Sequence, residues 1–198
     1  LQYPKKTLNI FENYPTIGVM GGKSIPIFEY KQPDWLNEFY GSLALRNLGD
    51  SCIIENWQNK YPENAPIGAG MAIRKDALKS YITKITSGKN TITDRIGNSL
   101  SSGGDNDIVL EILKSGWQTG YFPTLILYHI IPKERLSIKY LSQLSHNSNK
   151  SWIQVLNSHN INPWPRIPAW TVPLRKMKAW FLYKAWKNSV NYIRWKVA

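Results

Sequence analysis

The sequence has few of the residues that would hold a small fold together covalently or through a metal. Cys52 is the only cysteine among 198 residues, which excludes an intramolecular disulfide framework. The three histidines, His129, His146 and His159, lack the spacing of a zinc finger, so a structural zinc site is not expected. With a hydrophobic content of 42%, the chain is long enough to bury a core without such help.

Long apolar runs and common nucleotide-binding or catalytic signatures are missing as well. The longest apolar stretch, Leu125 to Ile131, is interrupted by His129 and is far shorter than the ~18 residues of a membrane-spanning helix. The sequence contains no phosphate-binding Gly-Lys-Ser/Thr loop, no His-Glu-x-x-His and no Gly-x-Ser-x-Gly. Gly68-x-Gly70 lacks the third glycine of a dinucleotide-binding fingerprint, and its apolar surroundings favour a strand.

Charge and aromatic residues are distributed unevenly along the chain. Residues 1–134 carry 14 basic and 13 acidic residues, whereas residues 135–198 carry 11 basic residues and no acidic one. Six of the nine tryptophans lie beyond residue 150. Prolines cluster over 162–168, and because proline fixes φ and disfavours helix before it, they predict an extended linker. We therefore expect a globular part over 1–160, a linker over 161–173 and a basic, Trp-rich tail over 174–198.

Hydrophobic periodicity in the globular part predicts strands that alternate with helices, which indicates an α/β fold. The expected strands are Thr16–Met20, which would end in a turn at Gly21-Gly22, then Ile67–Ile73, and a buried Thr124–Ile131. The expected helices are a weak one after Pro33, Arg74–Thr83, one from Asp105 to Gly116, and one capped by Ser137 that continues to about Leu156.

Two positions admit both a structural and a chemical interpretation. Asp105-Asn106-Asp107 has the spacing of a metal-clamping Asp-x-Asp, but it follows a polar, glycine-containing segment and begins a helix. Taken alone, Asp105 is therefore expected to be a helix N-cap. His129 lies inside an apolar strand, where a lone histidine is more often a hydrogen-bonded core side chain than a ligand. The order of the surrounding motifs favours a catalytic or metal-binding role for both positions over a structural one.

Several short motifs follow one another between residues 16 and 137. They are Gly21-Gly22-Lys23-x-x-Pro26, Pro66 to Lys75, Asp94-Arg95-Ile96-Gly97, Ser102 to Asp107, Gly116-Trp117, Tyr121-x-Pro123 and His129-x-Ile131-Pro132-x-Glu134-Arg135-Leu136. In this order and spacing they closely resemble a bacterial family 2 glycosyltransferase. The resemblance implies the acceptor-side portion of a GT-A fold, with a mixed sheet and flanking helices. Two departures are that Gly103-Gly104-Asp105 stands for the family's Gly-Glu-Asp, and Gly70 for its usual Asn.

The resemblance also implies a reaction, in which a sugar passes with inversion from a nucleoside diphosphate sugar to a hydroxyl of a glycan or lipid-linked acceptor. A carboxylate suits the base that takes the hydroxyl proton, so Asp105 is the expected catalytic residue. His129 is the expected ligand of Mg²⁺ or Mn²⁺, and Arg135 the expected contact to the donor diphosphate. The remaining expected active-site loop positions are Gly70, Met71, Gly103 and Gly104.

The family carries its nucleotide contacts and its metal-binding Asp-x-Asp ahead of the Gly21-Gly22 segment, in a region much longer than the 20 residues found here. The chain also begins with Leu1 rather than Met. We therefore expect the C-terminal portion of a transferase that does not bind its donor properly by itself.

The tail is expected to form one amphipathic helix that lies on an anionic membrane surface. Its apolar stripe would consist of Ala179, Leu182, Tyr183, Trp186, Val190, Ile193 and Val197, flanked by Lys176, Lys184, Lys187, Asn191 and Arg194. Tryptophan and basic residues beside such a stripe suit a lipid headgroup region, which implies a cytoplasmic protein, peripheral on the inner face of the cell membrane. The alternative is that the stripe packs on the globular part.

Two other function classes compete with sugar transfer. A basic, aromatic tail would suit a nucleic acid, but the globular part is nearly neutral and contains no RNA-binding motif, so no nucleic acid partner is expected. A non-catalytic carbohydrate-binding module would instead use exposed tryptophans to stack on sugars.

Overall fold

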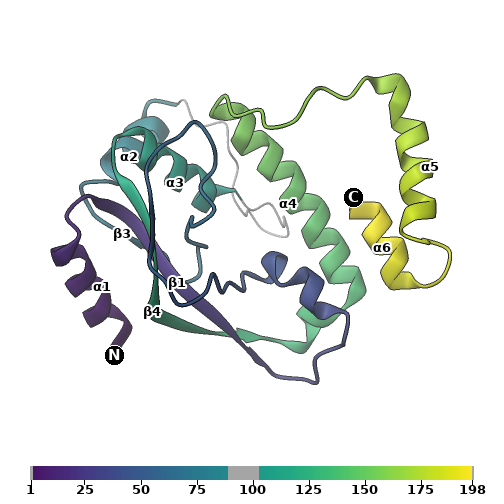
Figure 1. Ribbon diagram of the computed structural model, residues 1–198, viewed down its shortest axis with the longest axis horizontal. Coiled ribbons are helices and arrows are strands. Elements are labelled where there is room, and N and C mark those ends of the chain that lie inside the picture. Colours follow the sequence, from purple (N-terminus) through teal and green to yellow (C-terminus); the bar gives the residue numbers. More distant parts are fainter. Residues whose placement is uncertain (1, 89–102, 198) are drawn as a thin grey trace.

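The chain folds around a four-stranded mixed sheet with the strand order β2-β4-β1-β3. A computed structural model describes residues 2–88 and 103–197, with only the backbone of Val197 (Figure 1). The strands are β1 (Ile17–Phe28), β2 (Ile53–Glu55), β3 (Ala72–Ile73) and β4 (Gln118–Ile131). The expectation of a mixed α/β sheet with flanking helices is confirmed. The motif at 94–97 and Ser102 lie outside the described residues.

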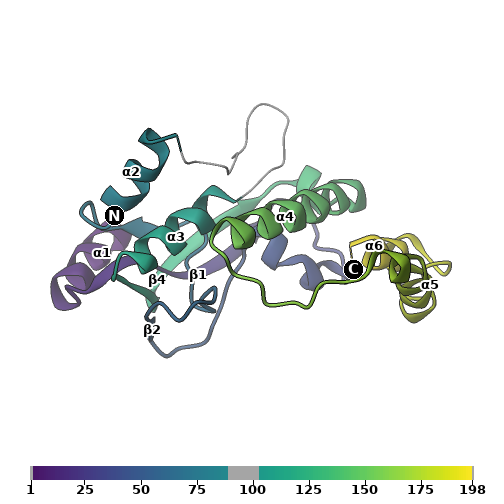
Figure 2. The same cartoon turned by 90° about the horizontal axis from the view of Figure 1, so that it is seen from above.

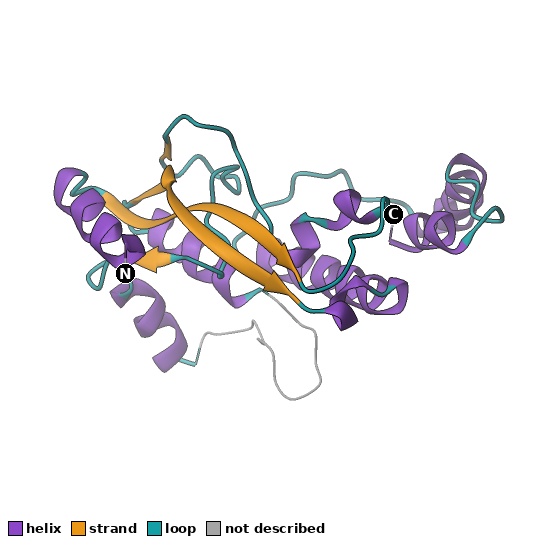
Figure 3. Cartoon of the chain, turned by 90° about the horizontal axis from the view of Figure 1, so that it is seen from below, coloured by secondary structure: helices purple, strands orange, loops and turns teal. Residues whose placement is uncertain are grey.

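The two long strands β1 and β4 lie side by side and pair in parallel (Figure 3). Their register runs from Ile17 opposite Gln118 to Phe28 opposite Ile131, with an irregularity between Gly21 and Lys23. The expected turn at Gly21-Gly22 is therefore wrong, because β1 continues through both glycines. A β-carbon at Gly22 would overlap main-chain oxygens of β4, so its absence is what lets the two strands approach here.

Helices pack on both faces of the sheet, although they cover one of the two faces only in part (Figure 2). Helix α1 (Gln2–Asn13) packs against one face, and α3 (Gly104–Lys114) and α4 (Ile138–Ser158) lie along the other. The apolar cluster below α1 contains Tyr3, Ile10, Phe11, Ile17, Met20, Phe122 and Leu125. The cluster below α3 contains Val19, Ala65, Ala77, Val109, Ile112 and Leu113.

Helices α3 and α4, whose ends are marked in the sequence by Gly116 and Ser137, are confirmed. Gly116, with φ +89°, directly follows the C-cap residue of α3 and supplies the left-handed conformation that commonly ends a helix. Ser137 is the N-cap of α4, and its hydroxyl accepts a hydrogen bond from the main-chain N–H of Tyr140 at 3.3 Å.

Elements with weaker local signals differ from expectation. The strand expected over Ile67–Ile73 is reduced to β3, and Gly70 lies in a loop with φ +80°. The helix expected over Arg74–Thr83 is α2 (Lys79–Thr86). It begins late because Arg74 is an anchor for β1, with its main-chain N–H donating to Gly18 O at 2.8 Å. The weak helix after Pro33 is a 3-10 helix over Leu36–Phe39.

The second half of β4 is not buried on both faces, contrary to expectation. Leu125 and Ile131 are buried, whereas Tyr128 and Ile130 are 62% and 57% exposed. Successive side chains of a strand point to opposite faces, and the described part of the chain leaves the outer face of this half uncovered. The apolar run Thr124–Ile131 therefore predicted the strand correctly, but it did not show that one face of the strand is exposed.

The expectation of one helix over 174–198 is also wrong. The tail forms two helices, α5 (Val172–Leu182) and α6 (Ser189–Val197), joined by a turn in which Lys184 has φ +49°. Helix α6 packs against α4, and Ile193 is buried in the same cluster as Leu36 and Leu141. No helix in the described ranges is long and apolar enough to cross a membrane.

The close approach at Gly22 gives the first prediction. In Gly22→Ala, the new β-carbon would lie 2.5 Å from the carbonyl oxygen of Phe122 and closer still to that of Leu125. Because both neighbours are main chain, we expect a loss of about 3 kcal/mol in the free energy of unfolding, measured by urea denaturation. The control is Gly41→Ala, at an exposed position with open space around it, where a change within about 0.5 kcal/mol is expected. Equal stability of the two variants would contradict the proposed packing constraint.

Candidate functional site

A pocket of about 650 Å³ brings together segments that are far apart in the sequence. Three residues expected to form the site, Asp105, His129 and Arg135, all line it. They come from the start of α3, the end of β4 and the 3-10 helix Lys133–Leu136. The other walls are the segment 41–46, the loop 66–69, and the side of α4 that carries Leu144, Ser148, Asn149 and Trp152.

Asp105 links two walls of the pocket. It is the second residue of α3 rather than its N-cap, which is Gly103, so the N-cap expectation is wrong. One carboxylate oxygen, Oδ2, accepts a hydrogen bond from the Gly68 N–H at 3.1 Å, and Oδ1 accepts one from the Asn106 N–H at 2.9 Å. The positive end of the helix macrodipole favours a negative charge at this place. The carboxylate is thereby held in a fixed orientation at the pocket.

His129 offers an unused ring nitrogen. It is half-buried rather than part of the core, and its Nδ1 is buried without a hydrogen-bond partner in the described part of the chain. Burial, together with the positive charge of Arg135, lowers the pKa of His129 below its usual 6.5, although a backbone hydrogen bond with Ala44 partly opposes this. The imidazole is therefore neutral at neutral pH, and its unpaired Nδ1 is an acceptor that a proton or a metal ion could reach only after a local rearrangement.

Two guanidinium groups give the pocket positive charge. Arg135 forms no side-chain hydrogen bond or ion pair with any residue that the structure describes, so it can bind an anionic ligand. Arg46 is instead fixed by the main chain, because it donates to the carbonyl oxygens of Ala65 and Glu63. Burial lowers the pKa of Arg46, with smaller opposing effects of Tyr61 and Tyr121, but a guanidinium remains charged near neutral pH.

Tyr61 and Trp152 form an aromatic wall of the pocket. Their rings meet edge to face with centroids 4.6 Å apart, and the Tyr61 hydroxyl donates to Asn106 Oδ1 at 2.5 Å. Burial, and then the negative charge of Asp105, raise the pKa of Tyr61, so the hydroxyl stays protonated and remains a donor. Arg46, Tyr61 and Trp152 were not expected to be site residues, because each lies outside the motifs that identified the others.

The four expected loop positions are not among the pocket-lining residues. Gly103 and Gly104 are buried at the start of α3, directly before Asp105. Gly70 lies beyond the loop 66–69, and its carbonyl oxygen accepts a hydrogen bond from the Tyr3 hydroxyl. Met71 packs against the apolar cluster below α3. These residues are therefore neighbours in the sequence of the segments that line the pocket, but they do not line it themselves.

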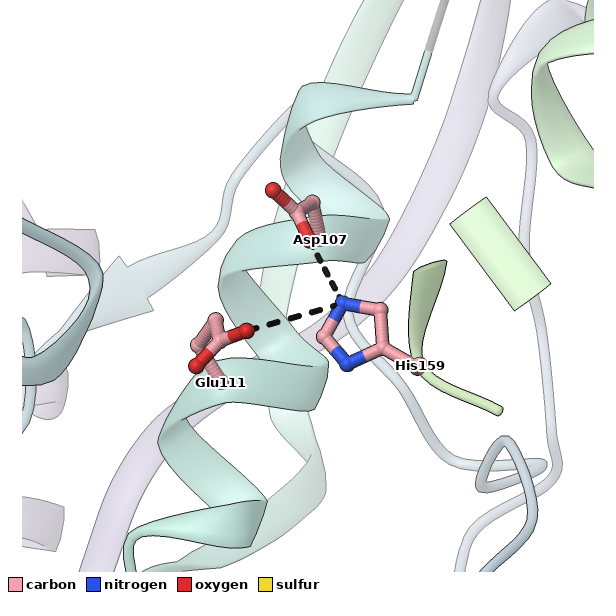
Figure 4. A group of neighbouring side chains, drawn as sticks. All are labelled: Asp107, Glu111 and His159. Carbon is pink, nitrogen blue, oxygen red and sulfur yellow. Dashed lines mark hydrogen bonds and ion pairs between the residues drawn. The ribbon is translucent and has the colours of Figure 1, made fainter. Parts of the chain in front are cut away.

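A second polar cluster lies on another side of α3 and was also missed (Figure 4). Asp107 is completely buried, and its Oδ1 lies 2.5 Å from His159 Nε2 and 2.6 Å from Lys84 Nζ. Lys84 also reaches Glu111 Oε1 at 2.9 Å, and His159 lies 3.8 Å from the same oxygen. The cluster joins α2, α3 and the end of α4 in a buried ion network.

Asp107, Glu111 and His159 are the only group of three metal-type side chains found within residues 2–88 and 103–197. Lys84 already bonds both carboxylates and offsets one of their two negative charges without an ion. Burial alone would raise the pKa of Asp107, but hydrogen bonds from His159 and Lys84 and the Lys84 charge outweigh it and lower that pKa. We interpret this cluster as structural. Among the residues that the structure describes, His129 belongs to no such group of three.

Searches of family models, curated proteins and solved structures give no significant match to this chain. The pocket is therefore interpreted from its own side chains: a fixed carboxylate, a neutral imidazole, two guanidinium groups and an aromatic wall. This combination can bind an anionic ligand and accept a proton beside it.

The buried ion network gives the second prediction. In Asp107→Asn, Lys84 keeps Glu111 as a partner but loses the buried Asp107 carboxylate that it shares with His159, and we expect a loss of about 2 kcal/mol in the free energy of unfolding at pH 7. Because the pKa of Asp107 is lowered by folding, its stabilisation is complete above the unfolded-state pKa and is lost as the pH falls through the folded-state value. The variant should therefore lose less stability than the wild type on acidification, measured by thermal unfolding from pH 7 to pH 3.

Asp76→Asn is the matched control, since Asp76 also pairs with a lysine but is exposed. We expect no measurable change in the melting temperature of that variant at pH 7. If Asp107→Asn were as stable as Asp76→Asn, the network would have no structural role.

Proposed function

We propose that this chain belongs to an inverting glycosyltransferase of the GT-A type. Its donor would be a nucleoside diphosphate sugar, and its acceptor a hydroxyl of a glycan or of a lipid-linked saccharide. The observation that carries the proposal is that Asp105, His129 and Arg135, each selected from motifs along the sequence, line one pocket. The mixed sheet with flanking helices is compatible with the acceptor-side portion of such a fold.

In the proposed reaction, Asp105 is the base. An acceptor hydroxyl attacks the anomeric carbon in line with the leaving diphosphate, and it loses its proton as the new bond forms. The Asp105 carboxylate is available for that proton because it borders the pocket and is oriented by the N–H groups of Gly68 and Asn106. A base fixed in this way loses little entropy on reaching the reactive geometry.

Positive charge in the pocket would stabilise the departing diphosphate. The Arg135 guanidinium is suited to two parallel hydrogen bonds with phosphate oxygens, and Arg46 adds a fixed positive charge. His129 borders the pocket and would supply one nitrogen ligand to a divalent ion such as Mn²⁺, or less readily Mg²⁺, once its buried Nδ1 is uncovered. Such an ion would neutralise charge on the diphosphate, whose own oxygens would have to supply further ligands.

A non-catalytic carbohydrate-binding module is the second candidate. It is favoured by a neighbouring pocket of about 450 Å³ that shares Arg46, Tyr61 and Trp152 with the first and adds Trp164, which is 54% exposed. Aromatic faces of this kind are suited to the apolar faces of sugar rings. Binding there would not need the Asp105 carboxylate, so the two candidates are distinguishable.

The third prediction tests the base. In the intact transferase, Asp105→Asn keeps the size of the side chain but gives up one of its two hydrogen bonds from main-chain N–H groups and cannot accept the proton, so we expect a fall of about 10²- to 10⁴-fold in the rate of sugar transfer. The assay follows release of the nucleoside diphosphate, and the control is Asp34→Asn, an exposed aspartate outside the pocket. Wild-type turnover by Asp105→Asn would exclude it as the base. Saccharide binding without transfer by the wild type would instead favour the second candidate.

The fourth prediction tests the metal. If His129 is a ligand, His129→Ala should raise the Mn²⁺ concentration for half-maximal activity by about tenfold or more, since even groups behind a ligand change metal affinity by about 10- to 100-fold. The matched control is His146→Ala, at an exposed position of α4. An unchanged metal titration combined with a lower melting temperature would assign His129 a structural role.

A further inference from the structure

One side of α5 presents a continuous apolar stripe to the solvent. Trp170, Leu174, Met177 and Phe181 follow one another at steps of four, three and four residues, and they are 75%, 56%, 56% and 61% exposed. Trp170 lies in the 3-10 helix Ala169–Thr171 directly before α5, and at 100° per residue Leu174, Met177 and Phe181 fall within about 60° of the circumference of α5. Isolated exposed apolar side chains are common, but a contiguous stripe on a folded helix indicates an interaction surface.

The opposite side of α5 is already used for packing. Trp180 meets Trp195 of α6 edge to face, with ring centroids 4.9 Å apart. The Trp195 indole N–H donates to the Lys176 carbonyl oxygen at 2.9 Å. Helix α6 is held in turn by the burial of Ile193 and by an ion pair with Glu38 of the globular part. The stripe therefore cannot turn inward without breaking these contacts.

The stripe is also placed where a large partner can reach it. Helix α5 lies at the end of the molecule farthest from the sheet, on the outside of α6 (Figures 1 and 2). Leu182 and Trp186, at the end of α5 and in the following turn, extend the exposed apolar surface with 70% and 54% exposure.

Basic residues surround this surface. Arg175 and Lys178 lie on α5, Lys184 and Lys187 lie in the turn, and all four are exposed. No acidic residue occurs after Glu134, so no acidic side chain of the tail itself offsets this charge.

Two copies of the surface would bring like charges together. A nucleic acid would leave Leu174, Met177 and Phe181 without a suitable partner. An anionic lipid bilayer meets both requirements, since it has an apolar interior below a layer of negative headgroups.

We propose that α5 binds in the plane of an anionic lipid surface. Trp170, Leu174, Met177 and Phe181 enter the boundary between headgroups and acyl chains, while Lys178, at the flank of the stripe, contacts headgroup phosphates. This surface differs from the one expected from the sequence, whose stripe included Ile193, because Ile193 is part of the protein core. The inference does not depend on sugar transfer, since it uses no residue of the pocket.

Vesicle co-sedimentation tests the proposal with the full chain. The lipids are phosphatidylcholine alone and phosphatidylcholine with phosphatidylglycerol at about 7:3. The variant Leu174→Ser/Met177→Ser/Phe181→Ser should reduce partitioning onto the anionic vesicles by about tenfold or more. The matched control, Leu8→Ser/Ile82→Ser/Ile85→Ser, changes three exposed apolar residues of α1 and α2 and should bind as the wild type does. Deleting the tail is less suitable, because it would uncover the core around Ile193.

A variant that removes positive charge separates the electrostatic contribution to lipid binding from the apolar one. Lys178→Gln should weaken binding to the anionic vesicles and reduce its sensitivity to salt, without changing binding to phosphatidylcholine alone. Absence of wild-type binding to the anionic vesicles, or equal binding by wild type and the α5 stripe variant, would overturn the proposal. Self-association without lipid that only the stripe variant abolishes would also overturn it, because the occupant would then be a second copy.

Discussion

The parallel pairing of β1 and β4 is the constraint on which the rest of the structure depends. Two adjacent parallel strands cannot be joined by a tight turn, so the chain between them must cross one face of the sheet. That crossing contains the loop 66–69 and α3, which carry Gly68 and Asp105 to the pocket. The same pairing brings the end of β4, with His129, to the opposite wall. Gly22 does not line the pocket, but by allowing β1 and β4 to approach each other it supports the arrangement of the residues that do.

Elements with local signals were predictable from the sequence, and those determined by distant partners were not. Helices α3 and α4 combine apolar periodicity with Gly116 and Ser137 at their ends, and both signals act within a few residues. The length of β1 depends instead on pairing with a strand about ninety residues later in the chain. Its glycines indicated a turn because the sequence alone does not show that β4 lies against them.

The residues of the candidate site also fall into those that the sequence could predict and those that it could not. Motif order identified Asp105, His129 and Arg135, whereas Arg46, Tyr61 and Trp152 reach the pocket only through tertiary packing. The Asp-x-Asp spacing was ambiguous for a geometric reason. Residues two apart on an α-helix point about 200° away from one another, so Asp105 borders the pocket while Asp107 faces the interior. Only a strand or a loop would direct both carboxylates to one ion.

The tail shows how a single buried residue determines the orientation of a surface. Its aromatic and aliphatic residues permit more than one apolar stripe, and the burial of Ile193 decides which one packs on the globular part. Helix α6 contacts α4, and α4 also lines the pocket with Leu144 and Trp152. The proposed lipid-binding stripe on α5 and the proposed active site are thus connected through α6 and α4. For a lipid-linked acceptor, this connection would hold the base at a fixed height above the surface from which the acceptor projects.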